Sequence, residues 1–154
     1  MLYAAVVVVA VAAVLLAIDG VRRRFAVVTV DGMSMAPTFT HGDRVLVRRV
    51  APSALRLGQV VVLQQHADHQ SWDTAPLPAR AVGTSRWYIK RIAAAPGDPV
   101  PPSAVRGVGA PAGTPVPVGR LVVIGDNVGE STDSRFWGYA PVDRVLGVVV
   151  RRMG

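Results

Sequence analysis

The sequence predicts a mainly β protein, in which one N-terminal helix precedes a compact antiparallel β domain. After residue 24 the apolar residues occur in short valine-rich runs separated by Gly, Asp and Pro, which is typical of strands joined by turns. No segment in that part of the chain has the apolar stripe of an amphipathic helix. The chain has 154 residues, which suits a single domain with a modest core.

The N-terminal helix is predicted from residues 2–18, a run without a single charged residue. This length is at the short end of what a helix needs to cross a bilayer. A cleaved signal peptide is the alternative, but no basic leader precedes the run and no clear cleavage site lies before Arg22. We therefore expect residues 2–18 to form a single uncleaved transmembrane anchor in the cell membrane.

The β domain is expected over residues 25–152. Within it, six runs are expected to be strands: 25–30, 44–50, 59–64, 87–94, 121–124 and 145–151. Residues 66–86 are polar and irregular, and residues 99–119 are dense in Pro, Gly and small residues. We expect both stretches to be loops or a reduced second subdomain with little core of its own.

The composition limits which reactive side chains the protein can use and which partners it can bind. Without cysteine, the chain has no disulfides and no thiolate metal sites. Its net charge of +7 favours anionic partners, and since no basic and aromatic residues interleave as on nucleic-acid platforms, a membrane surface is favoured. Sixteen of the seventeen basic residues are arginine, which is not deprotonated in proteins, so Lys90 is the one side chain that can act as an amine base.

The segment 31–38 lies between two predicted strands and contains a constrained serine, Ser34. Gly32 allows a positive φ, and Pro37 restricts both its own φ and the backbone of Ala36. A serine on a stiff turn is a candidate nucleophile if another residue can accept its proton. A turn capped by Ser and Thr side chains is the alternative from this segment alone.

Lys90 lies in the predicted strand 87–94. Alternation places it on one face with Tyr88 and Ile92, and places Trp87 and Ile89 on the other. Burial between apolar neighbours would lower the pKa of the amine towards the range of a general base. A surface lysine whose stem covers apolar neighbours is the alternative.

A third segment, 125–138, follows an apolar strand and concentrates polar residues. Asp133 and Arg135 can form an ion pair that fixes the loop, and Ser131 can hydrogen-bond to a catalytic group.

Histidines offer two competing kinds of site. His41 follows Ser34 closely enough for a Ser–His–Asp triad, and His66 with His69 has the spacing of a metal pair, although such histidines in a polar loop are usually exposed.

In order and spacing, these segments resemble the conserved boxes of the signal peptidase I family of serine proteases (family S26), of which this chain looks like a minimal member. Residues 32–38 resemble the nucleophile box and 42–47 the strand after it. Residues 90–98 resemble the general-base box, and 125–138 the last box. Only a short segment separates 98 from 125, where larger relatives carry a second β domain.

The resemblance implies a Ser–Lys dyad, with Ser34 as nucleophile and Lys90 as general base. The backbone N–H of Ser34 would contribute to the oxyanion hole. Some relatives carry a serine two residues before the nucleophile, where this chain has Gly32, so its oxyanion hole should depend more on backbone donors.

The remaining family positions support that dyad. Ser131 matches the residue that orients the lysine amine, and Asp133 with Arg135 matches the supporting pair. Met35 matches a residue near the substrate groove, which in the family accepts small side chains before the cut. No cofactor, metal or nucleic acid is implied.

The function implied is a membrane-anchored serine endopeptidase that removes signal or leader peptides from exported proteins. A specialised relative that matures one dedicated precursor is an alternative, as is a non-catalytic module that binds extended peptides. A self-cleaving repressor is disfavoured, because no pair of DNA-binding helices is predicted. The family topology places the catalytic domain outside the cytoplasm, whereas Arg22, Arg23 and Arg24 would favour the opposite orientation.

Overall fold

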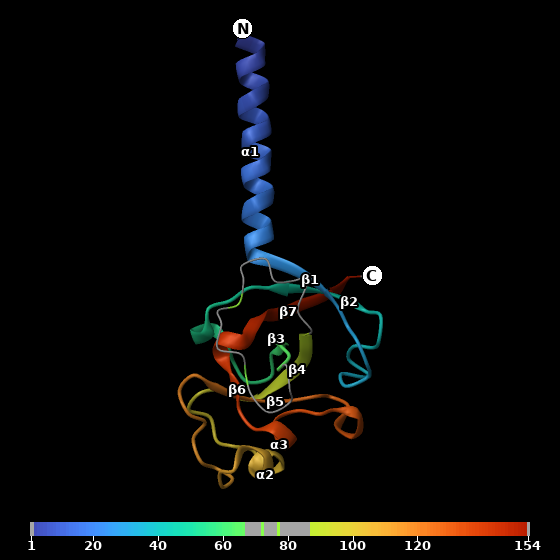
Figure 1. Cartoon of the computed structure of the whole chain (residues 1–154), viewed down its shortest axis with the longest axis vertical. Helices are drawn as coiled ribbons and strands as arrows, with labels where there is room; N and C mark the ends of the chain where they lie inside the picture. The colour runs from blue at the N-terminus through green and yellow to red at the C-terminus, as the bar shows by residue number, and fades with distance from the viewer. Residues whose placement is uncertain (1, 67–71, 73–76, 78–86, 154) are drawn as a thin grey trace.

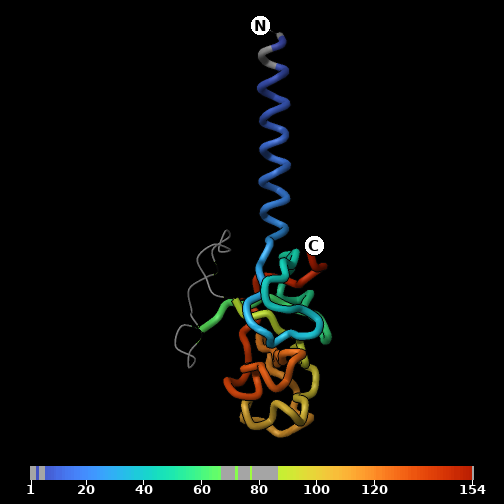
Figure 2. The backbone as a smooth tube through the Cα atoms, turned by 90° about the vertical axis from the view of Figure 1, so that its right-hand side faces the viewer, coloured from blue at the N-terminus to red at the C-terminus, as the bar shows by residue number. Residues whose placement is uncertain are grey.

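The computed structural model describes residues 2–66, 72, 77 and 87–153. One long helix, α1 (Leu2–Arg24), projects from a β domain (Figure 1). A second view, turned by 90°, shows the same arrangement, with α1 extending from one end of the β domain (Figure 2). The expected mainly β architecture with an N-terminal helix is therefore confirmed.

Within the described residues, the β domain is built on one antiparallel sheet of seven strands in the order β1-β2-β7-β3-β4-β5-β6. The strands are β1 (Phe25–Thr29), β2 (Arg44–Arg48), β3 (Val60–Gln64), β4 (Trp87–Ala94), β5 (Arg120–Ile124), β6 (Ala140–Pro141) and β7 (Val145–Met153). All six predicted strands are present. Strand β6 was not predicted, because two residues are too few to show a pattern.

The centre of the sheet is covered on both faces, which explains why β3 is an unbroken apolar run. Alternate residues of β3 contribute to two different hydrophobic clusters. Val60 and Val62 pack with residues of β1 and β2, while Val61 and Leu63 pack with residues of β5 and β7. Strand β4 has the same two-sided character, so a side chain from either of its faces enters the interior.

The segment after β4 forms a small cluster of its own, although little core was expected in residues 99–119. Its short helices are η3 (Pro102–Ala104) and α2 (Val105–Val108), and α2 packs against α3 (Ser134–Trp137) at the end of the domain far from α1 (Figure 1). Val100, Ala104 and Val116 are buried there against β4 and β5. The close packing requires Gly107, because a Cβ at that position would overlap the backbone of α3.

Helix α1 is longer than the predicted apolar run and continues to Arg24. It includes Asp19 and three arginines, Arg22, Arg23 and Arg24. Within the part of the chain that the structure describes, no helix combines the length and the apolar character needed to cross a membrane. This finding does not agree with the transmembrane anchor expected for residues 2–18.

Candidate active site

The turn that carries Ser34 is tightly fixed to the sheet. The N–H of Val30 donates to the carbonyl of Asp43, and the Asp43 carboxylate accepts from the N–H of Thr40. Gly32 has a φ of +85°, as its position predicted. The side chain of Met35 is 1% exposed and packs in the core beneath the turn. The serine is thus presented by a turn that is anchored on both sides.

Ser34 itself is half-buried, and its hydroxyl and its backbone N–H are both available. Within the described residues, neither its hydroxyl nor its backbone N–H makes a hydrogen bond. Its carbonyl oxygen, in contrast, accepts from the backbone N–H of Asn127 at 3.0 Å. Ser34 also lines a cavity of about 630 Å³. The residue can therefore receive a ligand without first losing an internal contact.

Lys90, in the middle of β4, lines the same cavity. Its side chain is 3% exposed, and its Nζ donates to the Ser131 Oγ at 2.9 Å. The Tyr88 ring lies on the same face of the strand, with its centre 5.7 Å from Nζ. Tyr88 and Ile92 pack in one cluster, whereas Trp87 and Ile89 pack in the other, so the predicted alternation is confirmed.

Burial makes the Lys90 amine easier to deprotonate. Loss of solvation lowers its pKa from 10.5 to about 8, because the ammonium form is the one that water stabilises. The negative charge of Asp133 acts in the opposite direction, and the positive charge of Arg135 lowers the pKa further. A lysine with a pKa near 8 has a substantial neutral fraction at neutral to mildly alkaline pH, as a general base requires.

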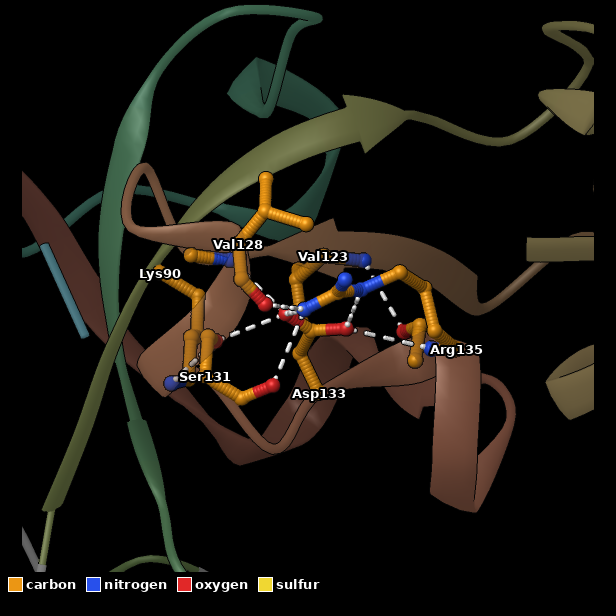
Figure 3. A network of polar contacts seen from close by, with 8 residues as sticks. Lys90, Val123, Val128, Ser131, Asp133 and Arg135 are labelled. Carbon is orange, nitrogen blue, oxygen red and sulfur yellow. Dashed lines mark hydrogen bonds and ion pairs between the residues drawn. The ribbon is translucent and has the colours of Figure 1, made fainter. Parts of the chain in front are cut away.

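A chain of hydrogen bonds holds the Lys90 amine in place (Figure 3). The Ser131 hydroxyl, which accepts from Lys90, donates in turn to Asp133 Oδ2 at 2.7 Å. Arg135 contacts both carboxylate oxygens of Asp133, at 2.8 and 3.0 Å, and the N–H of Gly125 adds a third donor. Burial alone would raise the pKa of Asp133, but these donors hold it below its usual value, so the carboxylate stays charged.

Gly125 joins the lysine side of the cavity to the serine side. A Cβ built on Gly125 would overlap the Ser131 hydroxyl and lie 2.5 Å from the carbonyl oxygen of Ser34. Only a glycine therefore allows the two serines to approach this closely. Within the described residues, Ser34 and Lys90 are not hydrogen-bonded to one another; they face a common cavity across this contact.

A second set of contacts, which we call the loop clamp, ties the turn of Ser34 to the loop after β5. Arg91 makes two hydrogen bonds to the Asp126 carboxylate, at 2.8 and 2.6 Å, and Thr38 donates to the same carboxylate at 2.5 Å. The Asn127 amide donates to the carbonyl of Met33 at 3.1 Å. The bond from Arg91 lowers the pKa of Asp126 and raises that of Arg91, so both stay charged. These residues were not predicted as site residues, because residues 125–127 also fit an ordinary turn.

Comparison with known proteins bears on what this cavity is. The family model described as signal peptidase, peptidase S26, matches residues 3–105 and 102–153. This chain belongs to that family. It is 28% identical over 137 residues to a signal peptidase I of Leptolyngbya laminosa, and this match covers 77% of this chain and 64% of the relative. It is also 31% identical over 159 residues to a probable signal peptidase I-2 of Synechocystis sp., and this match covers 89% of this chain and 66% of the relative.

A further relative, a probable signal peptidase I-1 of the same Synechocystis strain, is 27% identical over 134 residues. That match covers 74% of this chain and 63% of the relative. This S26 chain thus spans about two thirds of the length of the curated relatives it matches. The family match includes the turn of Ser34, strand β4 and the loop with Ser131, Asp133 and Arg135.

Two residues of this S26 chain lie elsewhere than the sequence suggested. Met35 is buried in the core and does not line the cavity, whereas the half-exposed side chain of Met33 does. A role for Met35 at the substrate therefore stays a prediction. His66 was expected to be exposed, but it is buried against the rings of Trp72, Tyr88 and Trp137. The three rings pack edge-on against His66, and this packing keeps its side chain out of the solvent.

Neither a histidine-based triad nor a metal site is supported by the described residues. The side chain of His41 is 69% exposed; its Nδ1 accepts from the N–H of Gly32 and lies 3.2 Å from the Asp31 carboxylate. His41 does not line the cavity that contains Ser34. His69 lies outside the described residues, and within the described part of the chain no three His, Cys, Asp or Glu side chains gather as metal ligands would.

Proposed function

We propose that this S26 family chain is a serine endopeptidase that cleaves signal or leader peptides with a Ser34–Lys90 dyad. The observation that carries the proposal is the shared cavity, in which an accessible serine faces a buried lysine with a pKa of about 8. Nucleophile and base are the two groups that amide hydrolysis by covalent catalysis requires. The relatives named signal peptidase I support the choice of substrate.

The reaction begins when the neutral Lys90 amine accepts the proton of the Ser34 hydroxyl. The hydroxyl oxygen attacks the scissile carbonyl, and the backbone N–H of Ser34 donates to the oxyanion that forms. The ammonium of Lys90 then returns the proton to the leaving amine. Water, activated by the same amine, hydrolyses the acyl-enzyme and releases Ser34.

Ser131 acts on the base and not on the substrate. Its hydroxyl accepts one N–H of Lys90, which directs the amine, while its own proton is donated to Asp133. Since Asp133 is fixed by Arg135 and Gly125, the hydroxyl has one orientation. The lone pair of a neutral amine oriented in this way is free to accept the proton of Ser34.

The substrate is an extended peptide with small residues before the cut. The cavity that contains Ser34 is also lined by Met33, Trp87 and Ile89, which can contact apolar side chains of such a peptide. We also propose that the peptidase works at a membrane, attached through α1. Large apolar side chains of α1, between residues 6 and 21, are exposed where the helix leaves the β domain.

Cleavage of a purified preprotein tests the assignment. Ser34→Ala and Lys90→Met should each lower kcat/KM by at least about 10²-fold, because each removes one of the two reacting groups. Methionine has nearly the length of lysine and keeps the buried stem, so the melting temperature of that variant reports any general damage. His41→Ala is the control and should cut like the wild type. Normal cleavage by either dyad variant would refute the proposal and would favour a non-catalytic peptide-binding module.

A second comparison concerns substrate range. If the protein has a housekeeping role, it should cleave general exported preproteins as well as any dedicated precursor. Cleavage of one precursor alone would assign it instead to the specialised peptidases of the same family. Both outcomes use the same dyad, so the Ser34→Ala variant serves as the blank in each.

A further inference from the structure

An arginine face lies on the outer side of the sheet at the base of α1. We define it by Arg44 and Arg48 of β2, Arg151 of β7, and Arg22 and Arg24 of α1. On β2, Arg44 and Arg48 are exposed, whereas the two valines between them, at positions 45 and 47, are fully buried. The alternation of the strand thus turns both arginines outward.

Strand pairing brings the third arginine to the same side. Arg151 is directly opposite Leu46, the residue between Arg44 and Arg48 on the outer face. Directly paired residues share a face of the sheet, so all three arginines project from it together. The partner of Arg48 on the other side is Phe25, the first residue after α1.

The helix end carries two further exposed arginines next to the Arg48 end of this face. The N–H of Arg49 donates to the carbonyl of Arg24 at 2.8 Å, which ties β2 to the base of α1. Strand β7 pairs with β2 along this stretch, with Met153 opposite Arg44 at the far end and Val148 opposite Arg48 beside the base of α1. Arg22 and Arg24 are exposed there, directly after the exposed apolar part of α1.

These five arginines have no acidic partner in the part of the chain that the structure describes. Among the described residues, none of them forms an ion pair, although neighbouring Arg23 pairs with Asp19 and Arg152 with Asp43. Like charges gathered on one face repel one another unless an anion is present. An array of guanidinium groups is well suited to phosphate oxygens, which it can bind with two parallel hydrogen bonds.

We propose that this arginine face binds the anionic headgroups of a lipid bilayer. The inference rests on the membrane association proposed above and adds which lipids are preferred and which residues select them. A bilayer is favoured over a nucleic acid, because the exposed apolar part of α1 directly precedes Arg22 and Arg24 in the chain. Apolar side chains would enter the lipid while the arginines stay at the level of the phosphates.

The test measures partitioning of the full-length chain onto vesicles of phosphatidylcholine alone and onto an equal mixture with phosphatidylglycerol. Arg44→Gln/Arg48→Gln removes two charges from the face. Arg106→Gln/Arg120→Gln is the matched control, because it removes two exposed arginines from α2 and β5 and gives the same net charge. Each surface arginine contributes about fivefold to binding of an anionic bilayer, so two should contribute about 30-fold.

We expect the Arg44/Arg48 variant to lose about 30-fold in binding to the mixed vesicles and nothing with phosphatidylcholine, whereas the control changes little. Equal losses in both variants, or none in either, would overturn the inference. Tighter binding of a DNA duplex, weakened in the same variant, would assign the face to nucleic acid. Peptide cleavage measured without vesicles should be unaltered in both variants, which separates failure of this inference from failure of the proposed dyad.

Discussion

The charges beside Lys90 allow a test in which two substitutions act in opposite directions. Asp133 raises the pKa of Lys90, and Arg135 lowers it. Asp133→Asn keeps an oxygen that can accept from Ser131 and Gly125 but removes the negative charge. Arg135→Gln removes the positive charge instead. The first variant should therefore lower the pKa of Lys90, and the second should raise it.

The size of the first shift follows from the geometry. Two hydrogen bonds, of 2.9 and 2.7 Å, meet at the Ser131 oxygen and place the Asp133 carboxylate within about 6 Å of the Lys90 Nζ. At an effective dielectric constant of about 20, two unit charges at that separation interact by about 3 kcal/mol, which corresponds to about 2 pKa units. Asp133→Asn should thus move the pKa of Lys90 from about 8 towards about 6.

The assay is the dependence of kcat/KM on pH for a soluble peptide substrate. Because the base must be neutral in the free enzyme, kcat/KM rises with pH through the pKa of Lys90. The midpoint of this rise should lie near pH 8 in the wild type, lower in Asp133→Asn and higher in Arg135→Gln.

The opposite directions are the decisive feature, since general loss of structure would reduce the rate at every pH without moving the midpoint. Thermal melting of each variant at one pH reports its folding independently. Midpoints that coincide with that of the wild type, or that move the same way in both variants, would refute the role assigned to Lys90.

Three further predictions concern the serine turn and the stability of the fold. Gly125→Ala should lower kcat/KM strongly and destabilise the fold by about 1–3 kcal/mol, as measured by urea denaturation, because its Cβ would lie 2.5 Å from the carbonyl oxygen of Ser34. Thr38→Val should cost about 1 kcal/mol, since Asp126 loses one donor, and peptide cleavage should fall while the pH midpoint stays constant. Between pH 7 and pH 10, the unfolding free energy of the wild type should rise by about 2–3 kcal/mol relative to that of Lys90→Met. The folded pKa of Lys90, about 8, lies below its unfolded value, so the unfolded state binds more protons in this window.

The strands could be predicted because each is a local pattern. The valine-rich runs and the turns between them locate β1 to β5 and β7, and the alternation on β4 separates Tyr88 from Trp87 correctly. The order of the strands could not be derived in this way. It places β7, from the end of the chain, between β2 and β3, and such pairing depends on contacts between distant segments.

The sequence predicted the contacts of Ser131 with the lysine and of Asp133 with Arg135, which the structure contains, but not the contacts of the loop clamp. The isolated Lys90 and the dense segment from Ser131 to Arg135 suggested a base and its support, and the structure brings Lys90 and Ser131 into hydrogen-bond contact. The sequence did not indicate that Asp126 and Thr38, which are 88 residues apart, share a hydrogen bond. Neither residue type is unusual in a turn, so only the folded chain shows their contact.

The loop clamp and the lysine network have a common origin in the pleat of β4. Lys90 and Arg91 are neighbours, and successive side chains of a strand point to opposite faces. Lys90 therefore reaches Ser131 on one side, while Arg91 reaches Asp126 on the other. Both acceptors belong to the loop after β5, and so one pair of basic residues fixes the loop at two points. Because Asp126 also binds the turn of the nucleophile through Thr38, the position of that serine is set by the same strand that carries the base.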